Sequence, residues 1–131
     1  MIGLDTNVLV RYLAQDDKSQ SAAAGRLIER ELSQETPGFV SLIVLVETVW
    51  VLESCYGSSR ADIAAVLERL LRVKQLKIQD AETAWRALRL FLSCKADFSD
   101  CLIERLGHAN GCLHTATFDK VAAKSAGMKL L

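Results

Sequence analysis

The sequence has little proline, few aromatic residues and no surplus of charge of either sign. The only proline is Pro37, and no Gly/Ser-rich linker interrupts the chain, so one domain over residues 1–131 is expected. Sixteen basic residues balance sixteen acidic ones. This balance argues against a general binder of polyanions, because nonspecific nucleic-acid binding rests on Lys and Arg neutralising phosphates. It does not exclude local patches of one sign.

Long hydrophobic runs are also absent. The longest nearly apolar stretch, residues 39–46, is far shorter than the ~20 residues that a membrane-spanning helix needs. Asp5 interrupts the first apolar residues, so no targeting signal is expected at the amino end. The four cysteines form neither a C-x-x-C pair nor a dense framework, which predicts free, mostly buried thiols. We therefore expect a cytoplasmic protein without membrane contact.

Short apolar segments alternate with longer segments whose apolar residues recur at helical spacing. Strands are predicted at residues 2–4, 39–40, 76–78, 112–117 and 128–131. Helices are predicted at residues 6–13, 24–32, 42–52, 63–71, 81–92, 98–109 and 120–126. This order predicts a three-layer α/β fold with a central, mostly parallel sheet of about five short strands flanked by helices. Ligands of such sheets bind beyond the carboxyl ends of the strands, where Asp5 and Asp119 fall.

Two acidic residues interrupt strongly apolar segments. Asp5 follows Ile2-Gly3-Leu4, where a carboxylate is costly to bury unless it is paired or binds a metal; equally, it could cap a helix that starts at Thr6. Glu47 lies in the middle of the apolar segment 41–52, where capping cannot explain it. A functional role is favoured over a buried salt bridge, or a narrow exposed stripe shared with Ser54, because a buried unpaired charge is so unfavourable.

A second group of acidic residues lies nearer the carboxyl end. Asp97, Asp100 and Glu104 are spaced i, i+3, i+7 and share one helix face. Helix capping is the favoured explanation for Asp97, whereas Asp100 leads into a helix that is expected to be largely buried. Glu104 could as easily be solvated. Asp119 follows a predicted strand, and its alternative explanation is again a cap, for the helix that starts at Lys120.

Asp5, Glu47, Asp100 and Asp119 would repel one another if they converged. Two like charges ~4 Å apart cost ~4 kcal/mol at an effective dielectric of ~20, so such a cluster raises its pKa values or binds a cation. All-oxygen ligands select Mg²⁺ or Mn²⁺ over zinc. No Ser-His or Cys-His pair indicates a protein nucleophile. A metal-activated water is then the candidate for attack on a phosphodiester.

The motifs around these acids resemble those of PIN-domain ribonucleases, specifically the VapC toxins of toxin–antitoxin pairs. The similar segments are residues 2–9, 41–47, 96–103 and 117–120; they follow the family's order, and the similarity spans the whole chain. The resemblance implies a PIN fold and Mg²⁺- or Mn²⁺-dependent endonucleolytic cleavage of RNA, often at one tRNA or rRNA site. It also implies a homodimer, and inhibition by a VapB-like antitoxin whose tail fills the acidic groove.

The resemblance also assigns roles to individual residues. The metal-binding places fall on Asp5, Glu47, Asp100 and Asp119, with Asp97 as a candidate fifth acid. The residues implied to orient these ligands are Thr6, Asn7 and Thr117. Glu104-Arg105 departs from the family pattern, which often has small apolar residues there, and could alter the groove or the antitoxin contact. Arg11 could touch a phosphate, although an ordinary surface position is favoured.

Two other functions use a similar set of acids. A HAD-type phosphatase also begins with a strand that ends in Asp, but it needs a second Asp where this chain has Asn7. A PIN-like scaffold could bind a protein or RNA partner without cutting it. The presence of all four acids argues against such a decayed site.

Overall fold

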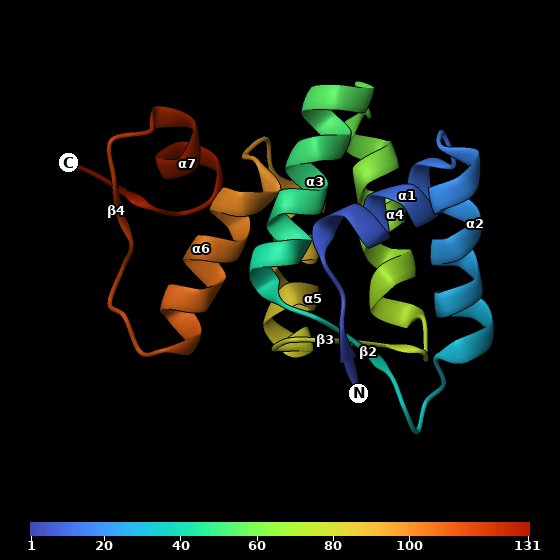
Figure 1. Ribbon diagram of the computed structural model, residues 1–131. Helices are drawn as coiled ribbons and strands as arrows, with labels where there is room; N and C mark the ends of the chain where they lie inside the picture. The colour runs from blue at the N-terminus through green and yellow to red at the C-terminus, as the bar shows by residue number, and fades with distance from the viewer. The chain divides into compact units, whose positions relative to one another are not determined.

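Five short strands and seven α-helices alternate along the chain in the computed structural model, which describes residues 1–131 (Figure 1). The chain divides into two packing units, Met1–Gln79 and Asp80–Leu131, named here unit 1 and unit 2. Each unit contains both parallel strands and helices. The α/β class predicted from the sequence is therefore confirmed, whereas the single domain over residues 1–131 stays a prediction.

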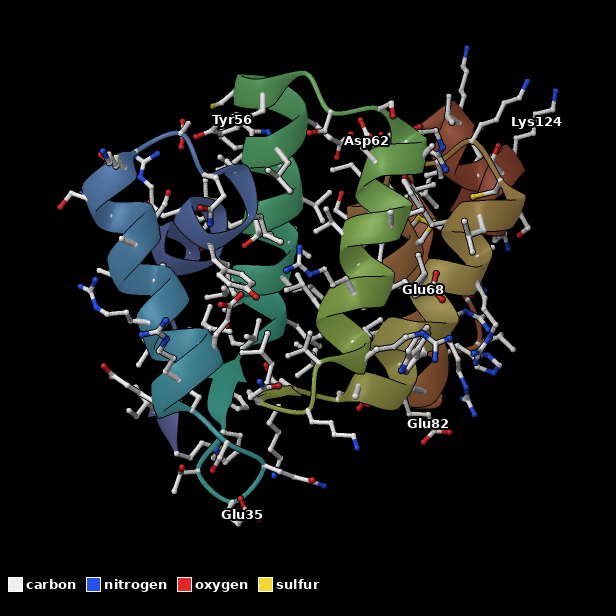
Figure 2. All side chains as sticks on the ribbon, turned by 90° about the vertical axis from the view of Figure 1, so that its right-hand side faces the viewer. Glu35, Tyr56, Asp62, Glu68, Glu82 and Lys124 are labelled. Atoms are coloured by element: carbon white, nitrogen blue, oxygen red, sulfur yellow. The ribbon has the colours of Figure 1, made fainter.

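Unit 1 holds a three-stranded parallel sheet flanked by helices. Its elements are β1 (Ile2–Gly3), α1 (Thr6–Ala14), α2 (Lys18–Arg26), the π-helical turn η1 (Leu27–Glu31), β2 (Gly38–Val40), α3 (Leu42–Tyr56), α4 (Arg60–Arg72) and β3 (Leu76–Ile78). β2 lies between β1 and β3. Figures 1 and 2 show that α3 and α4 lie side by side and run in opposite directions.

The central strand of this sheet is closely packed at its start. A side chain on Gly38 would place its Cβ 2.7 Å from a methyl carbon of Leu32 and 2.8 Å from one of Leu4, so only glycine fits there without rearrangement. The fully buried side chains of unit 1 come mainly from one face of each helix. They include Leu9, Ile28, Leu45, Ile63 and Leu67. The apolar spacing along α4 thus predicted correctly which face packs inward.

Unit 2 holds a smaller parallel pair of strands. Its elements are α5 (Ala81–Ser93), α6 (Phe98–Ala109), β4 (Ala116–Thr117), α7 (Lys120–Ser125) and β5 (Lys129–Leu130). α5 and α6 pack against each other, and the rings of Phe91 and Phe98 meet edge to face with centroids 6.0 Å apart. Both rings are almost fully buried, so this contact anchors the first turn of α6.

Several predictions of detail are corrected by the structure. The five strands form hydrogen-bonded sheets of three and two rather than one five-stranded sheet. The strand predicted at residues 112–117 is shortened to Ala116–Thr117, and the second helix ends in the π-helical turn η1. The cysteines form no disulfide, but only Cys101 is buried, while Cys55 and Cys112 are exposed. No helix combines the length and the apolar character needed to cross a membrane.

Candidate active site

The carboxyl ends of β1, β2 and β3 lie at one edge of the unit 1 sheet, because the strands are parallel. Asp5 follows β1 and begins α1, while Ser41 follows β2 and begins α3. Ser41 Oγ accepts a hydrogen bond of 3.1 Å from the backbone N–H of Val44. Gln79, which follows β3, accepts one of 3.0 Å at Oε1 from the backbone N–H of Leu42. Two helices thus start at the edge where ligands bind in such folds.

Asp5 caps α1 with one carboxylate oxygen. Its Oδ1 accepts a hydrogen bond of 2.8 Å from the backbone N–H of Thr6, which confirms the capping alternative, and Oδ2 takes no part in this cap. The residue is exposed, so a cation from solvent can reach it. Thr6 is buried and its hydroxyl has no hydrogen-bond partner. An unsatisfied buried hydroxyl is rare, and it lies directly beside a candidate metal ligand.

Glu47 lies on the exposed face of α3, contrary to the burial expected from the sequence. The stripe shared with Ser54, the weaker alternative, is confirmed, and Ile43 and Trp50 lie on it as well. The prediction failed because α3 carries apolar residues on its solvent face as well as on its buried face. The high cost of a buried charge therefore does not support a role for Glu47. Its proposed place among the metal ligands rests on the family resemblance alone.

Asp119 is held by the turn that follows β4. Its backbone N–H donates a hydrogen bond of 2.9 Å to Thr117 Oγ1. Its Oδ1 accepts hydrogen bonds from the backbone N–H groups of Val121, at 2.8 Å, and Ala122, at 3.0 Å. The capping alternative is therefore confirmed for Asp119, and Oδ2 again takes no part in the cap. Thr117 fixes the course of the backbone at this acid.

Asp97, Asp100 and Asp119 lie close enough in unit 2 for their charges to interact. Asp97 stands at the N-cap position of α6, as expected, but its side chain makes no capping hydrogen bond. Asp100 is half-buried in the first turn of α6. Burial raises the pKa of Asp100, and the negative charges of Asp119 and Asp97 raise it further. The charged form of Asp100 is therefore disfavoured at this position.

Glu104 and Arg105 are both partly buried and neutralise each other. Arg105 donates a hydrogen bond to each oxygen of the Glu104 carboxylate, one of them 2.9 Å from Nη2 to Oε1. This bidentate ion pair raises the pKa of Arg105. The departure from the family pattern is thus an ion pair formed within α6, and Glu104 is not simply solvated.

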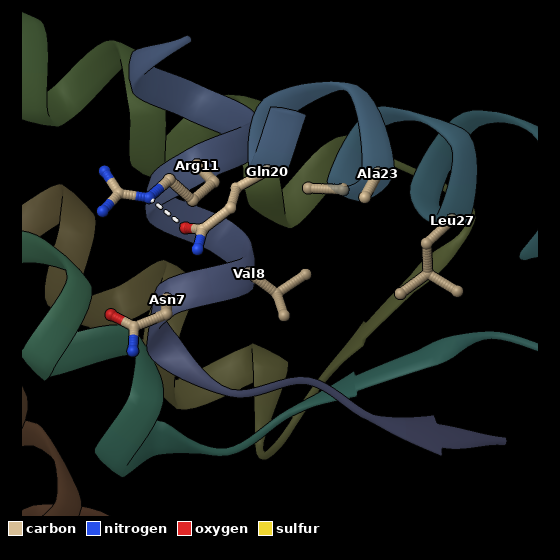
Figure 3. A pocket seen from close by; sticks show the side chains of 7 residues that line it. Asn7, Val8, Arg11, Gln20, Ala23 and Leu27 are labelled. Atoms are coloured by element: carbon tan, nitrogen blue, oxygen red, sulfur yellow. Dashed lines mark hydrogen bonds between the residues drawn. The ribbon is translucent and has the colours of Figure 1, made fainter. Parts of the chain in front are cut away.

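Arg11 is tied to its neighbours in unit 1. Its Nε donates a hydrogen bond of 2.7 Å to Gln20 Oε1, drawn in Figure 3, and its Nη1 pairs with Asp16 at 3.1 Å. The Tyr56 hydroxyl donates one of 2.6 Å to the same aspartate. Asn7 lines the adjoining cavity of about 360 Å³ and is exposed. This network was missed from the sequence, because Tyr56 lies forty-five positions from Arg11 and no local pattern links them.

No group of three or more His, Cys, Asp or Glu side chains in the structure is arranged so that it could hold a metal ion. Asp5 and Glu47 belong to unit 1, whereas Asp97, Asp100 and Asp119 belong to unit 2. Every one of these donors is a carboxylate, which is the ligand class that Mg²⁺ and Mn²⁺ prefer. The donor set therefore fits a hard divalent cation better than zinc.

Comparison with known proteins identifies the class of this fold. The model of the PIN domain family matches residues 2–127, and the chain belongs to that family. Among curated proteins, the chain is similar to a VapC ribonuclease of Aquifex aeolicus (strain VF5). The two are 30% identical over 100 residues, which cover 76% of this chain and 73% of that protein. The family resemblance drawn from the four motifs is thereby confirmed.

Proposed function

We propose that this chain is a metal-dependent endoribonuclease of the VapC type, the toxin of a toxin–antitoxin pair. Membership of the PIN domain family and similarity to a VapC ribonuclease support the class of activity. The observation that carries the proposal is the grouping of Asp97, Asp100 and Asp119, in which burial and the charges of Asp119 and Asp97 raise the pKa of Asp100. A perturbed carboxylate that lies beside further acids is typical of a site that recruits a cation.

The residues that would hold Mg²⁺ or Mn²⁺ are Asp5, Glu47, Asp100 and Asp119, with Asp97 as a candidate fifth ligand. The caps of α1 and α7 use Oδ1 of Asp5 and Oδ1 of Asp119, so Oδ2 of each acid stays outside the cap. The Asp97 carboxylate is likewise not used as a cap. When bound, such an ion lowers the pKa of a water and screens phosphate charge, which provides the means of hydrolysing a phosphodiester.

The residues around the acids would act by holding them in place. Thr117 fixes the backbone of Asp119, and the helix N-terminal N–H groups of α7 fix its Oδ1. Thr6 fixes Oδ1 of Asp5 through its backbone N–H and offers a buried hydroxyl that has no other partner. Such surrounding contacts set the geometry of carboxylate ligands. Asn7 forms no hydrogen bond with an acid, so its role rests on the resemblance.

The partners follow from the same assignment. We propose an RNA substrate, with tRNA or rRNA as the class, and a VapB-like antitoxin that inhibits the enzyme. A homodimer in the cytoplasm is the expected working form. These partners are supported by the motif resemblance and by the similarity to a VapC ribonuclease.

The deciding experiment compares the purified protein with its Asp5→Asn variant on total cellular RNA, in Mg²⁺, in Mn²⁺ and in EDTA. Asn retains the cap of α1, so the variant is expected to fold. Asp17→Asn is the matched control, because Asp17 caps α2 in the same manner through Gln20. We expect discrete, metal-dependent cleavage by the wild type and the control, and its loss in Asp5→Asn. Equal cleavage by all three proteins, or cleavage that persists in EDTA, would contradict the proposal.

A binding measurement separates a silent scaffold from an enzyme. Mn²⁺ titration followed by electron paramagnetic resonance is expected to show weaker binding in Asp5→Asn and Asp100→Asn than in Asp17→Asn. The scaffold alternative would be favoured if the folded wild-type protein, free of antitoxin, bound RNA but bound neither Mn²⁺ nor Mg²⁺.

A further inference from the structure

A cavity of about 530 Å³ in unit 2 is lined by three lysines and no acidic residue. The lysines are Lys95, Lys120 and Lys124, and we call this cavity the lysine pocket. Ser93, Cys94 and Ser125 supply further polar or polarisable groups to its lining. The chain as a whole carries no net charge, so this grouping of three positive charges is a local feature. It was not apparent from the composition.

The lysines gather because α7 is amphipathic. Lys120, Lys124 and Ser125 lie on one face of this short helix, at positions i, i+4 and i+5, while Ala122 on the other face is fully buried. Lys95 comes from the connection between α5 and α6, just after the last residue of α5. All three lysines are exposed, and Figure 2 shows Lys124 reaching away from the ribbon. The ammonium groups of Lys120 and Lys124 are thus available to an anion from solvent.

Two acids of unit 2 form ion pairs with arginines. Arg86 pairs with Glu82 at 2.8 Å, and Arg105 pairs with Glu104. Lys120 and Lys124 form no ion pair with any acid. A positive charge held in a concave surface attracts anions more strongly than the same charge on a flat face. The lysine pocket is therefore a place for an external anionic group.

The lysine pocket lies on the same two chain segments as the carboxylate cluster. Lys120 directly follows Asp119, and Lys95 precedes Asp97 by two residues. Adjacent Cα atoms lie ~3.8 Å apart, so the backbone of Lys120 lies directly beside that of Asp119, and the backbone of Lys95 lies within two Cα–Cα steps of Asp97. An RNA strand that places one phosphate at the metal-binding acids must place its neighbouring phosphates nearby. Those phosphates need positive charge that the acids cannot offer.

Resting on the proposed function, we infer that the lysine pocket binds the phosphate backbone of single-stranded RNA beside the bond that is cleaved. Lysines act as mobile point charges, and serine hydroxyls donate hydrogen bonds to phosphate oxygens without reading a base. The lysine pocket thus contributes affinity and places the strand, and leaves the choice of sequence to other surfaces. No covalent step occurs in it.

The first test measures binding without cleavage. A short fluorescent single-stranded oligoribonucleotide of mixed sequence is titrated in EDTA, by fluorescence anisotropy, over a range of salt concentrations. The double variant Lys120→Gln/Lys124→Gln is compared with Lys74→Gln/Lys129→Gln, which removes the same charge from exposed lysines outside the lysine pocket. The plot of log K against log salt has a negative slope, and each lost phosphate contact reduces the magnitude of that slope by about 0.7 for single strands. In Lys120→Gln/Lys124→Gln only, we expect the magnitude of the slope to be smaller by about 1.4 and binding at low salt to be roughly tenfold weaker.

The second test uses Cys94 as a native probe inside the lysine pocket. Iodoacetamide labelling, resolved by peptide mass spectrometry, reports on each thiol with and without the oligoribonucleotide. We expect RNA to slow labelling of Cys94 several-fold and to leave labelling of the exposed Cys55 and Cys112 unchanged. Equal protection of all three thiols, or none at Cys94, would overturn the inference.

The two proposals can fail separately. If the wild type cleaves RNA with metal but the Lys120→Gln/Lys124→Gln variant keeps wild-type affinity and slope, the lysine pocket is not a phosphate site and the nuclease proposal stands. If binding needs the lysines but no preparation cleaves RNA in Mg²⁺ or Mn²⁺, the lysine pocket stands and the nuclease proposal fails. If an acidic peptide protects Cys94 and the oligoribonucleotide does not, the lysine pocket serves a protein partner and the inference is wrong.

Discussion

The hydroxyl oxygen of Thr117 accepts a hydrogen bond of 2.9 Å from the backbone N–H of Asp119. This bond closes a turn directly after β4 and sets the direction in which the Asp119 side chain leaves the backbone. Two N–H groups at the start of α7 then hold its Oδ1. The acid is thus fixed at its backbone and at one oxygen, although it lies in an exposed loop.

Replacing Thr117 by Val removes this acceptor while nearly preserving the shape of the side chain. We expect Thr117→Val to weaken Mn²⁺ binding by about tenfold, because residues that orient metal ligands typically contribute 10- to 100-fold in affinity. Isothermal titration calorimetry with Mn²⁺ checks this. Thr117→Ser keeps the hydroxyl and should restore most of the affinity. If Val and Ser variants bind Mn²⁺ equally well, Thr117 has no positioning role.

The pKa of Asp100 predicts a dependence of stability on pH. Burial and the charges of Asp119 and Asp97 raise this pKa, so the folded protein holds the Asp100 proton more tightly than the unfolded chain does. In EDTA, the free energy of unfolding of the wild type should therefore fall as pH rises from the ordinary Asp pKa, ~3.9, through the raised value. Asp100→Asn lacks this loss, so its stability relative to the wild type should rise over the same pH window. Urea denaturation at a series of pH values measures the difference.

The effect of the Asp119 charge on Asp100 can also be measured directly, as the pKa of Asp100. Asp119→Asn removes the larger of the two charge effects that raise the pKa of Asp100, but it keeps a side chain that can cap α7. We expect the pKa of Asp100, followed by carbon-13 NMR of its carboxyl, to be lower in this variant than in the wild type. Asp80→Asn, on the same unit but without an effect on Asp100, is the control. An unchanged pKa in Asp119→Asn would show that the charge of Asp119 does not contribute to the shift.

The packing of α6 depends on Phe98, which is fully buried and meets Phe91 edge to face. We expect Phe98→Ala to lower the free energy of unfolding by about 3–5 kcal/mol, the usual range for removing a buried aromatic side chain. Leu113→Ala is the matched control, because Leu113 is 95% exposed and its loss should change stability by less than about 0.5 kcal/mol. Chemical denaturation of both variants in EDTA tests this without involving a metal. Similar stabilities of the two variants would mean that Phe98 does not anchor α6.

The periodicity of apolar residues predicted the helices well, because a helix with one apolar face has apolar residues at regular intervals in the sequence. The predicted helix over residues 98–109 is the observed α6, Phe98–Ala109. Strands of two or three residues carry too few side chains to reveal their partners, so the division into sheets of three and two was not predictable. Nor can an apolar segment show which of its sides faces solvent, and this is why Glu47 was misplaced.

The candidate site, like the fold, was predicted from the sequence only in part. The sequence singled out the acids as candidates because lone carboxylates stand out among apolar residues, and their role stays a prediction. Asp5 and Asp119 do follow parallel strands. It did not identify the lysine pocket, because Lys95 and Lys124 come from segments that meet only in the folded chain. Asp97 also illustrates the limit of local patterns, since its position is that of a cap and its side chain does not act as one.

Arg11, Asp16 and Tyr56 form a hydrogen-bonded network at the end of α3. This network predicts a dependence of stability on pH that is opposite in sign to the one predicted for Asp100. The hydrogen bond donated by the Tyr56 hydroxyl is the largest cause that lowers the pKa of Asp16, so ionised Asp16 stabilises the fold above the ordinary Asp pKa. Tyr56→Phe removes this bond and should raise the pKa of Asp16. Compared with the variant, the wild type should be more stable at neutral pH and should lose that advantage as pH falls through the lowered pKa. A double-mutant cycle with Asp16→Asn, followed by urea denaturation at both extremes, measures the coupling, which should vanish at low pH because the carboxyl is then protonated. Coupling that persists there would assign the effect of Tyr56 to its packing rather than to the charge of Asp16.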